Sequence, residues 1–105
     1  MSTFNGEKYL PEQIESILNQ HWPKLEIVIR DDGSTDGTID LLRQYANTYD
    51  NISILFGNNI GVVKSFFALL EYVPCEADFI AFSDQDDVWE PNKLAYAVEN
   101  LTSVE

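Results

Sequence analysis

The sequence predicts an α/β fold, a parallel sheet with helices packed on both of its faces. Short apolar runs, rich in β-branched and aromatic residues, alternate with longer segments in which apolar residues recur at helical spacing. The runs predict three strands: Leu25–Arg30, Ile52–Phe56 and Asp78–Phe82. They are apolar at successive positions, which is typical of strands covered on both sides. Strands that alternate with helices imply βαβ units joined by right-handed crossovers.

Helical spacing predicts the remaining elements: Glu12–Gln20, Thr38–Tyr49, Val62–Tyr72 and a last helix that begins at Pro91. Pro11 fits the first turn of the first helix, because a proline there gives up no hydrogen bond. Thr38 is placed as the N-cap of the second helix. The third helix is apolar on most faces, so we expect it to be buried.

The chain opens on a turn-like stretch, Ser2–Gly6. Such a composition is usual just after a strand, so we expect a first strand to lie upstream of the sequence. We therefore treat residues 1–105 as one partial domain, truncated at both ends. A sheet without its first strand has an unpaired edge, and exposed edges promote association. We expect this fragment to self-associate or to be marginally stable, unless another chain covers that edge.

Composition narrows the range of functions. The 105 residues hold 18 acidic and 6 basic side chains, a formal net charge of −12. This charge argues against binding to nucleic acid or to an anionic membrane, and an anionic ligand would need a metal ion or amide donors. Cys75 is the single cysteine, so neither an internal disulfide nor a Cys/His zinc site is available. Polar residues follow Met1 directly and no apolar run approaches the ~20 residues of a membrane span, so we expect a cytoplasmic protein.

Polar clusters follow the predicted strands. They are Asp31–Thr38, Gly57–Gly61 and Ser83–Asp87, with Ser2–Gly6 as a fourth if a strand precedes it. Ligands of open parallel sheets bind outside the carboxyl ends of the strands, so these clusters should line one edge of the sheet.

Asp84, Asp86 and Asp87 form the sharpest of these clusters. Three carboxylates so close together repel one another. A hard cation such as Mg²⁺ or Mn²⁺ between Asp84 and Asp86 would offset that repulsion and bridge two phosphates of a ligand. The alternative is a solvated acidic turn that caps the helix at Pro91.

Two other residues are candidates for ligand contacts. Asp32 lies in a loop between a strand and a helix, where it would accept a hydrogen bond from a base N–H or a ribose hydroxyl. Turn and capping chemistry alone also explains this loop. Asn59–Gly61 would aim backbone N–H groups at a phosphate, with Lys64 in the next turn. A helix start that needs glycine is the plainer alternative there.

Taken together, these stretches resemble the N-terminal, nucleotide-sugar-binding half of a family 2 glycosyltransferase with the Rossmann-like GT-A fold. The matching stretches are Ser2–Gly6, Gln13–Gln20, Glu26–Thr38, Asn59–Gly61 and Asp84–Trp89. They cover nearly the whole chain. They are most similar to bacterial enzymes that build surface polysaccharides, including rhamnosyltransferases.

The resemblance implies roles for particular residues. Thr3 and Asp32 would contact the nucleotide base, and Lys64 the base or the phosphates. Asp84 would contact the ribose or a Mg²⁺ or Mn²⁺ ion, and Asp86 would hold that metal on the diphosphate. In this family the catalytic base belongs to a second half of the domain, so we expect it outside this sequence.

The implied reaction is the inverting transfer of a sugar from a UDP- or dTDP-linked donor to a hydroxyl of a glycan or lipid-linked acceptor. The fragment alone is expected to bind nucleotide and metal without catalysing transfer. Association of the parent protein with the inner face of the membrane stays open. The alternatives are a receiver-type phosphoacceptor domain, which would need a lysine soon after Asp78–Phe82, and a non-catalytic nucleotide- or metal-binding module.

Overall fold

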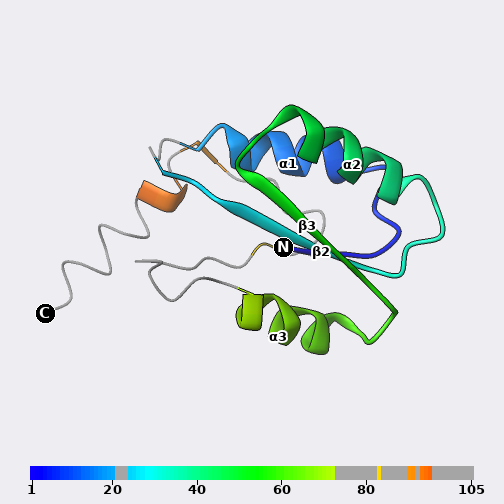
Figure 1. Ribbon diagram of the computed structural model, residues 1–105. Helices are drawn as coiled ribbons and strands as arrows, with labels where there is room; N and C mark the ends of the chain where they lie inside the picture. Colours follow the sequence, from blue (N-terminus) through cyan, green and yellow to red (C-terminus); the bar gives the residue numbers. More distant parts are fainter. Residues whose placement is uncertain (21–23, 73–82, 84–89, 92, 96–105) are drawn as a thin grey trace, which may run out of the picture.

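The computed structural model describes residues 1–20, 24–72, 83, 90–91 and 93–95. Its elements follow one another as β1 (Ser2–Thr3), α1 (Leu10–Leu18), β2 (Ile27–Asp32), α2 (Thr38–Thr48), β3 (Ile52–Gly57) and α3 (Val62–Tyr72). The strands form a parallel sheet in the order β1-β2-β3. α1 and α2 cover one face of this sheet and α3 covers the other (Figure 1). The predicted α/β architecture is confirmed.

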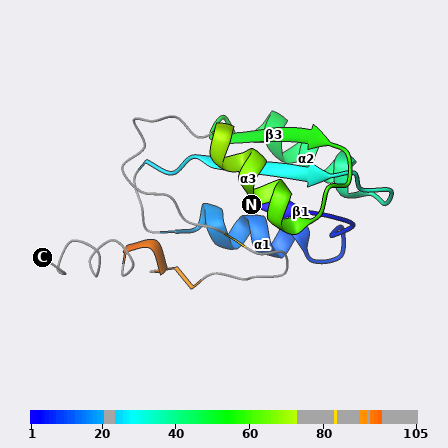
Figure 2. The ribbon, with the colours of Figure 1, turned by 90° about the horizontal axis from the view of Figure 1, so that it is seen from below.

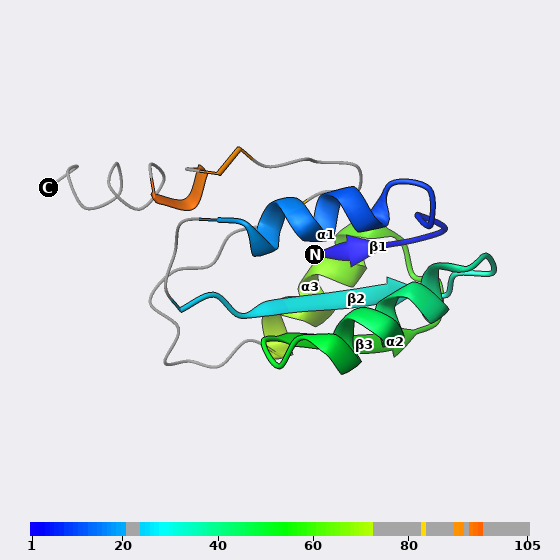
Figure 3. The same ribbon diagram turned by 90° about the horizontal axis from the view of Figure 1, so that it is seen from above.

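The helices on the two faces pack against different strands. α1 and α2 lie side by side over the sheet when the molecule is viewed from above (Figure 3), as expected for two successive crossovers of the same hand. α3 packs on the opposite face against β1 and β2 (Figure 2). Because α3 follows β3 in the chain, the chain changes faces at the carboxyl end of β3.

The end of a first strand lies within the chain, which corrects the expectation that this strand lies wholly upstream. Ser2 and Thr3 pair with Arg30 and Asp31 of β2. The Arg30 N–H donates to the Met1 carbonyl, with N and O 2.9 Å apart. The polar Ser2-Thr3 pair conceals this strand in the sequence, because both residues are buried although neither is apolar.

β2 and β3 pair from Ile27 with Ile52 to Asp32 with Gly57, so the carboxyl ends of the strands meet at one edge. Side chains alternate between the two faces along a strand. On β2, Ile27 therefore belongs to the core under α1 and α2, whereas Arg30 and Asp32 face α3. This alternation places a charged pair on one face of the sheet and the hydrophobic core on the other.

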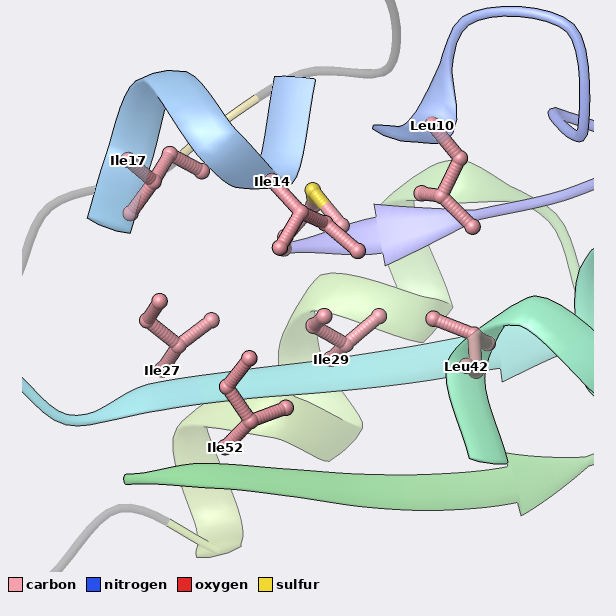
Figure 4. Close-up of a cluster of buried hydrophobic side chains, with 8 residues drawn as sticks. Leu10, Ile14, Ile17, Ile27, Ile29, Leu42 and Ile52 are labelled. Atoms are coloured by element: carbon pink, nitrogen blue, oxygen red, sulfur yellow. The ribbon is translucent and has the colours of Figure 1, made fainter. Parts of the chain in front are cut away.

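The hydrophobic core lies between the sheet and the α1–α2 layer (Figure 4). Its buried members are Met1, Leu10, Ile14, Ile17, Ile27, Ile29, Leu42 and Ile52. Burying a side chain of this size contributes about 1.5–3 kcal/mol. The cluster joins both helices to β2 and β3, and so fixes the edge from which the loops emerge.

α3 is less buried than its sequence predicts. Its bounds match the prediction, Val62–Tyr72, but its buried residues are only Ser65 and Leu69. Val63 and Phe67 are 66% and 62% exposed. The helix presents a narrow face to the sheet, and no described residue covers the apolar face that carries Val63 and Phe67.

Smaller differences concern element boundaries. α1 begins at Leu10 instead of Glu12, with Pro11 in its first turn as predicted. β2 spans Ile27–Asp32 instead of Leu25–Arg30, so Asp31 and Asp32 end the strand and do not lie in the loop that was predicted to follow it. Gly37 occupies the N-cap position of α2, so the assignment of Thr38 as N-cap is wrong. The Thr38 hydroxyl is instead engaged by other loop residues.

The strand predicted at Asp78–Phe82 lies outside the described residues, as does most of the helix predicted from Pro91. Among the helices that the structure does describe, none is long and apolar enough to cross a membrane.

Candidate functional site

The loops that follow β1 and β2 bind each other at the carboxyl edge of the sheet. The Asn5 N–H donates to Ser34 Oγ (2.9 Å), and the Thr35 N–H donates to Asn5 Oδ1 (2.8 Å). The Gly6 N–H donates to the Thr38 hydroxyl oxygen (2.9 Å). These bonds hold the end of β1 next to the loop that follows β2.

The loop after β2 is closed by Asp31 and touches the loop after β3. The Asp31 carboxylate, in a residue only 1% exposed, accepts the Ser34 N–H (2.9 Å) and the Ser34 hydroxyl (2.5 Å). Gly33 has a φ of +81°, and a Cβ at this position would lie 3.0 Å from the Asn59 nitrogen. Only glycine fits here without strain, and its missing Cβ is what allows the two loops to approach each other closely.

Asp32, the last residue of β2, orders the loop after β3. Its Oδ1 accepts hydrogen bonds from Arg30 Nη1 (2.6 Å) and the Ile60 N–H (2.9 Å), and its Oδ2 accepts the Gly61 N–H (3.1 Å). Burial alone would raise the pKa of Asp32. The Ile60 N–H, Arg30 and the Gly61 N–H outweigh burial and hold the pKa below its usual value. Asp32 is therefore ionised at neutral pH although it is 4% exposed.

Arg30 extends this set of contacts to α3 and β1. Its Nη1 also donates to Ser65 Oγ (3.0 Å), and its Nη2 donates to the Asn58 carbonyl (3.1 Å). The Ser2 hydroxyl donates to Ser65 Oγ (2.6 Å). A Cβ at Gly57 would collide with Arg30 Nη2, so the missing side chain leaves room for the guanidinium. One buried polar network thus connects β1, β2, α3 and the loop after β3.

The sheet edge and its loops can be compared with those of known proteins. The family model for glycosyl transferase family 2 matches residues 1–103. The chain belongs to glycosyltransferase family 2. The predicted resemblance is confirmed, and the receiver-type alternative is not favoured.

Relatives within glycosyltransferase family 2 include the dTDP-rhamnosyl transferase RfbG of Shigella flexneri. RfbG is 39% identical over 105 residues, which cover 96% of this chain and 36% of RfbG. Another is the putative glycosyltransferase EpsE of Bacillus subtilis, 38% identical over 103 residues that cover 96% of this chain and 36% of EpsE. This chain therefore spans about a third of the length of the curated relatives.

Solved structures with the GT-A fold show the same architecture. Residues 1–349 of Staphylococcus aureus TarS, in complex with UDP, match with a TM-score of 0.82 at 31% identity over 96% of this chain and 30% of that chain. The mannosyltransferase PcManGT from Pyrobaculum calidifontis, in complex with GDP-Man and Mn²⁺, matches with a TM-score of 0.88 at 26% identity over 98% of this chain and 31% of that chain. The predicted GT-A fold is confirmed.

Two of the nucleotide contacts predicted for this glycosyltransferase family 2 chain lie at the same edge of the sheet. Thr3 ends β1 and pairs in register with Asp31, the residue before Asp32. Thr3 and Asp32 are both buried. Lys64 lies in the first turn of α3, with an exposed side chain, next to the buried Ser65. The contacts of these residues with a nucleotide stay predictions.

The predicted metal ligands, Asp84 and Asp86, lie outside the described residues. Ser83, which precedes them, is 3% exposed, and its Oγ accepts a hydrogen bond from Gln13 Nε2 (3.1 Å). Within the described part of the chain, no group of three His, Cys, Asp or Glu residues is placed to hold a metal ion. No contact within the described residues therefore bears on the metal ligands predicted at Asp84 and Asp86.

Sequence reasoning missed the part that Arg30 and Ser65 play at this edge. Arg30 did carry a signal, because a cation at the end of an apolar strand and directly before two aspartates must find a partner when the strand is buried. Ser65 carried a weaker one, as a polar residue in a helix that is otherwise largely apolar.

Proposed function

We propose that this chain is the donor-binding half of an inverting glycosyltransferase. The enzyme would transfer a sugar from a UDP- or dTDP-linked donor to a hydroxyl of a glycan or lipid-linked acceptor, in bacterial surface polysaccharide synthesis. Family membership supports this, as do relatives described as a dTDP-rhamnosyl transferase and as TarS in complex with UDP. Because the chain spans about a third of its relatives, we expect the catalytic base to come from a part of the enzyme outside these 105 residues. The chain alone would bind the donor without transferring the sugar.

The observation that carries this proposal is the buried Asp32 carboxylate at the carboxyl edge of the sheet, whose three donors favour its ionised form. Three protein donors bind it, whereas a carboxylate offers about four acceptor positions. An ionised carboxylate accepts hydrogen bonds and cannot donate them, so it favours a base with an N–H at its edge. Uracil and thymine present such an N–H between two carbonyl groups. Thr3, which ends the neighbouring strand in register with Asp31, is the second residue proposed to contact the base.

The proposed metal site is formed by Asp84 and Asp86. Two carboxylates supply the hard oxygen ligands that Mg²⁺ and Mn²⁺ prefer, and the PcManGT complex contains Mn²⁺. When bound, the ion would neutralise charge on the departing diphosphate. Lys64, exposed in the first turn of α3, would add a positive charge near the phosphates. A chain with a net charge of −12 needs such local positive charge to bind a diphosphate.

We place this reaction in the cytoplasm. The inner face of the membrane would be the place of transfer if the acceptor is lipid-linked. The acidic composition argues against nucleic acid as a partner.

Calorimetric titration tests the donor site. UDP and dTDP are titrated in Mn²⁺ and in EDTA, with ADP as the comparison nucleotide, because adenine presents a ring acceptor where uracil presents an N–H. Asp86→Ala should weaken UDP or dTDP binding in Mn²⁺ roughly ten- to hundredfold, to the level found in EDTA. Asp32→Ala should remove the preference for UDP and dTDP over ADP.

The control for these two variants is Asp40→Ala, an exposed carboxylate in the first turn of α2. Asp36 does not serve, because its Oδ1 accepts the Thr38 N–H (3.0 Å) and the Thr38 hydroxyl (2.5 Å) at the start of α2. Equal affinity in Mn²⁺ and in EDTA would contradict the metal site. An unchanged preference for UDP in Asp32→Ala would contradict the base contact.

A further inference from the structure

A buried cation stands directly behind the proposed base contact. Arg30 is 7% exposed in a chain of strongly acidic composition. A guanidinium removed from water is costly unless its donors are paired. Arg30 pairs with Asp32, Ser65 and Asn58, which lie at the carboxyl edge or on the helix beside it.

Arg30 and Asp32 brace the loop after β3 from its two ends. At the start of the loop, the Arg30 guanidinium holds the Asn58 carbonyl. At its end, the Asp32 carboxylate holds the N–H groups of Ile60 and Gly61. The ion pair between the two side chains, 2.6 Å from Nη1 to Oδ1, joins these contacts into one unit that consists of Arg30, Asp32 and the loop at residues 58–61.

Ser65 connects the same unit to the rest of the fold. Its hydroxyl oxygen lies between Arg30 Nη1 (3.0 Å) and the Ser2 hydroxyl (2.6 Å), and the residue is fully buried. The position of the guanidinium therefore depends on the rotation of α3 about its axis. It also depends on the position of the end of β1.

We propose that Arg30 is a positioning residue for the donor: it fixes the Asp32 carboxylate and the loop at residues 58–61 in the geometry that the nucleotide base meets. This inference rests on the proposed function, in which Asp32 contacts the base. Arg30 itself touches no part of the donor.

Arg30 also helps to keep Asp32 ionised, because burial raises the pKa of this carboxyl and the Ile60 N–H, the guanidinium and the Gly61 N–H together lower it against that effect. Arg30 is the charged group that acts on this carboxyl in the described structure. β1, β3 and the loop at residues 58–61 carry no charged side chain, and Lys64 of α3 is exposed. Without the guanidinium, burial would favour the neutral acid, so Asp32 would take up a proton at a higher pH. Protonation turns one acceptor position of the carboxylate into a donor and removes its negative charge, so Asp32 would bind a base N–H less strongly.

The test compares Arg30→Met, Arg30→Lys and the control Arg43→Met. All three are made in the full natural protein that contains this chain. Arg43 is exposed on α2, where its guanidinium lies over the Phe56 ring. Affinity for UDP and dTDP is measured by calorimetry from pH 5 to 8. The backbone N–H signals of Ile60 and Gly61 are followed by NMR, and thermal unfolding identifies variants that do not fold.

Arg30→Met should bind UDP or dTDP roughly ten- to hundredfold more weakly at pH 7. Its affinity should fall more steeply towards pH 5 than that of the parent and of Arg43→Met, because titration of the nucleotide's own phosphate near pH 6 acts equally on all the proteins. Arg30→Lys restores the charge without the forked donors. It should recover the pH profile of the parent, with intermediate affinity and shifted Ile60 and Gly61 signals.

Two results separate this inference from the proposed function. If Asp32→Ala weakens binding but Arg30→Met binds like the parent at every pH, Arg30 is not a positioning residue and the function stands. If Asp32→Ala binds like the parent, the proposed base contact itself is wrong. Should Arg30→Met fail to fold, Arg30→Lys decides, because parental affinity with parental Ile60 and Gly61 signals would overturn the inference.

Discussion

Gln13 and Ser83 are joined by a buried hydrogen bond of 3.1 Å between Nε2 and Oγ, although they stand 70 residues apart in the chain. Gln20, just beyond α1, donates to the Glu90 carbonyl (2.7 Å) and accepts the Leu94 N–H (3.0 Å). Two glutamines from the α1 region thus hold the residues on either side of the sequence segment that contains the predicted metal ligands.

Replacing Gln13 by leucine should destabilise the protein. The change removes a fully buried amide and leaves the Ser83 hydroxyl without this donor, which costs about 1–3 kcal/mol. Urea unfolding followed by circular dichroism measures the change. Gln44→Leu, at an exposed position of α2, should unfold within about 0.5 kcal/mol of the parent. Equal stability of the two variants would show that the Gln13–Ser83 bond contributes nothing.

Alanine substitutions at two glycines of the carboxyl edge distinguish the cost of backbone strain from the cost of steric crowding. Gly33 and Gly61 have φ values of +81° and +89°, so alanine at either position should cost about 1–2 kcal/mol. A Cβ at position 33 would also lie 3.0 Å from the Asn59 nitrogen, whereas a Cβ at position 61 meets nothing within 4 Å. Gly33→Ala should therefore be the less stable variant in thermal unfolding. The reverse order would contradict the close approach of the two loops.

The stability of the fold should depend on the ionisation of Asp32 in acid. Because the folded protein holds the pKa of Asp32 below the ordinary 3.8, its stabilising contribution is complete above that pH and is lost as the pH falls below it. Asp32→Asn should be less stable than the parent at pH 7, because Arg30 loses its counter-charge. The difference in unfolding free energy should shrink between pH 4 and lower pH.

Urea unfolding at a series of pH values measures that difference, with Asp40→Asn as the exposed control. A gap between parent and Asp32→Asn that stays constant down to acid pH would show that Asp32 is not a stabilising carboxylate. At pH 7, Asp40→Asn should unfold within about 0.5 kcal/mol of the parent.

Self-association of the chain stays a prediction, but it now rests on an exposed face of α3 and no longer on an unpaired strand edge. β1 pairs with β2, so a wholly missing strand is no longer its cause. The exposed Val63 and Phe67 lie one turn apart on α3, and an apolar patch of this kind promotes association. The double variant Val63→Lys/Phe67→Lys should lower the apparent mass in sedimentation at high concentration.

Glu71→Lys is the matched control for this double variant. It changes the net charge by the same amount on the same helix, and Glu71 is also exposed. If both variants dissociate the protein equally, charge and not the apolar face governs association. If the parent is a monomer at every concentration, the prediction is wrong.

The sequence predicts the fold of this chain better than it predicts the site. Leu25–Arg30 and Ile52–Phe56 can be recognised as strands because their apolar runs mark positions that only a covered sheet accommodates. Such patterns report burial along one element. They do not report which loops touch, and so the bracing of the Asn58 carbonyl by Arg30 cannot be derived from them.

α3 shows the limit of the same reasoning. Apolar residues on most of its faces predict burial, yet a helix that packs on a sheet contacts it with one narrow face. Ser2 and Thr3 show the opposite error, since polar residues that find hydrogen-bond partners are buried in the sheet without any apolar signal.

Arg30 and Gly57 restrict each other across the pairing of β2 with β3. A Cβ at position 57 would collide with the guanidinium, so the residue at one position limits which residues fit at the other. A homologue that carries a side chain at position 57 should have a shorter residue at position 30, and a lineage that loses the arginine becomes free to replace the glycine. The two positions should therefore covary among natural sequences, although neither is the other's neighbour in the chain.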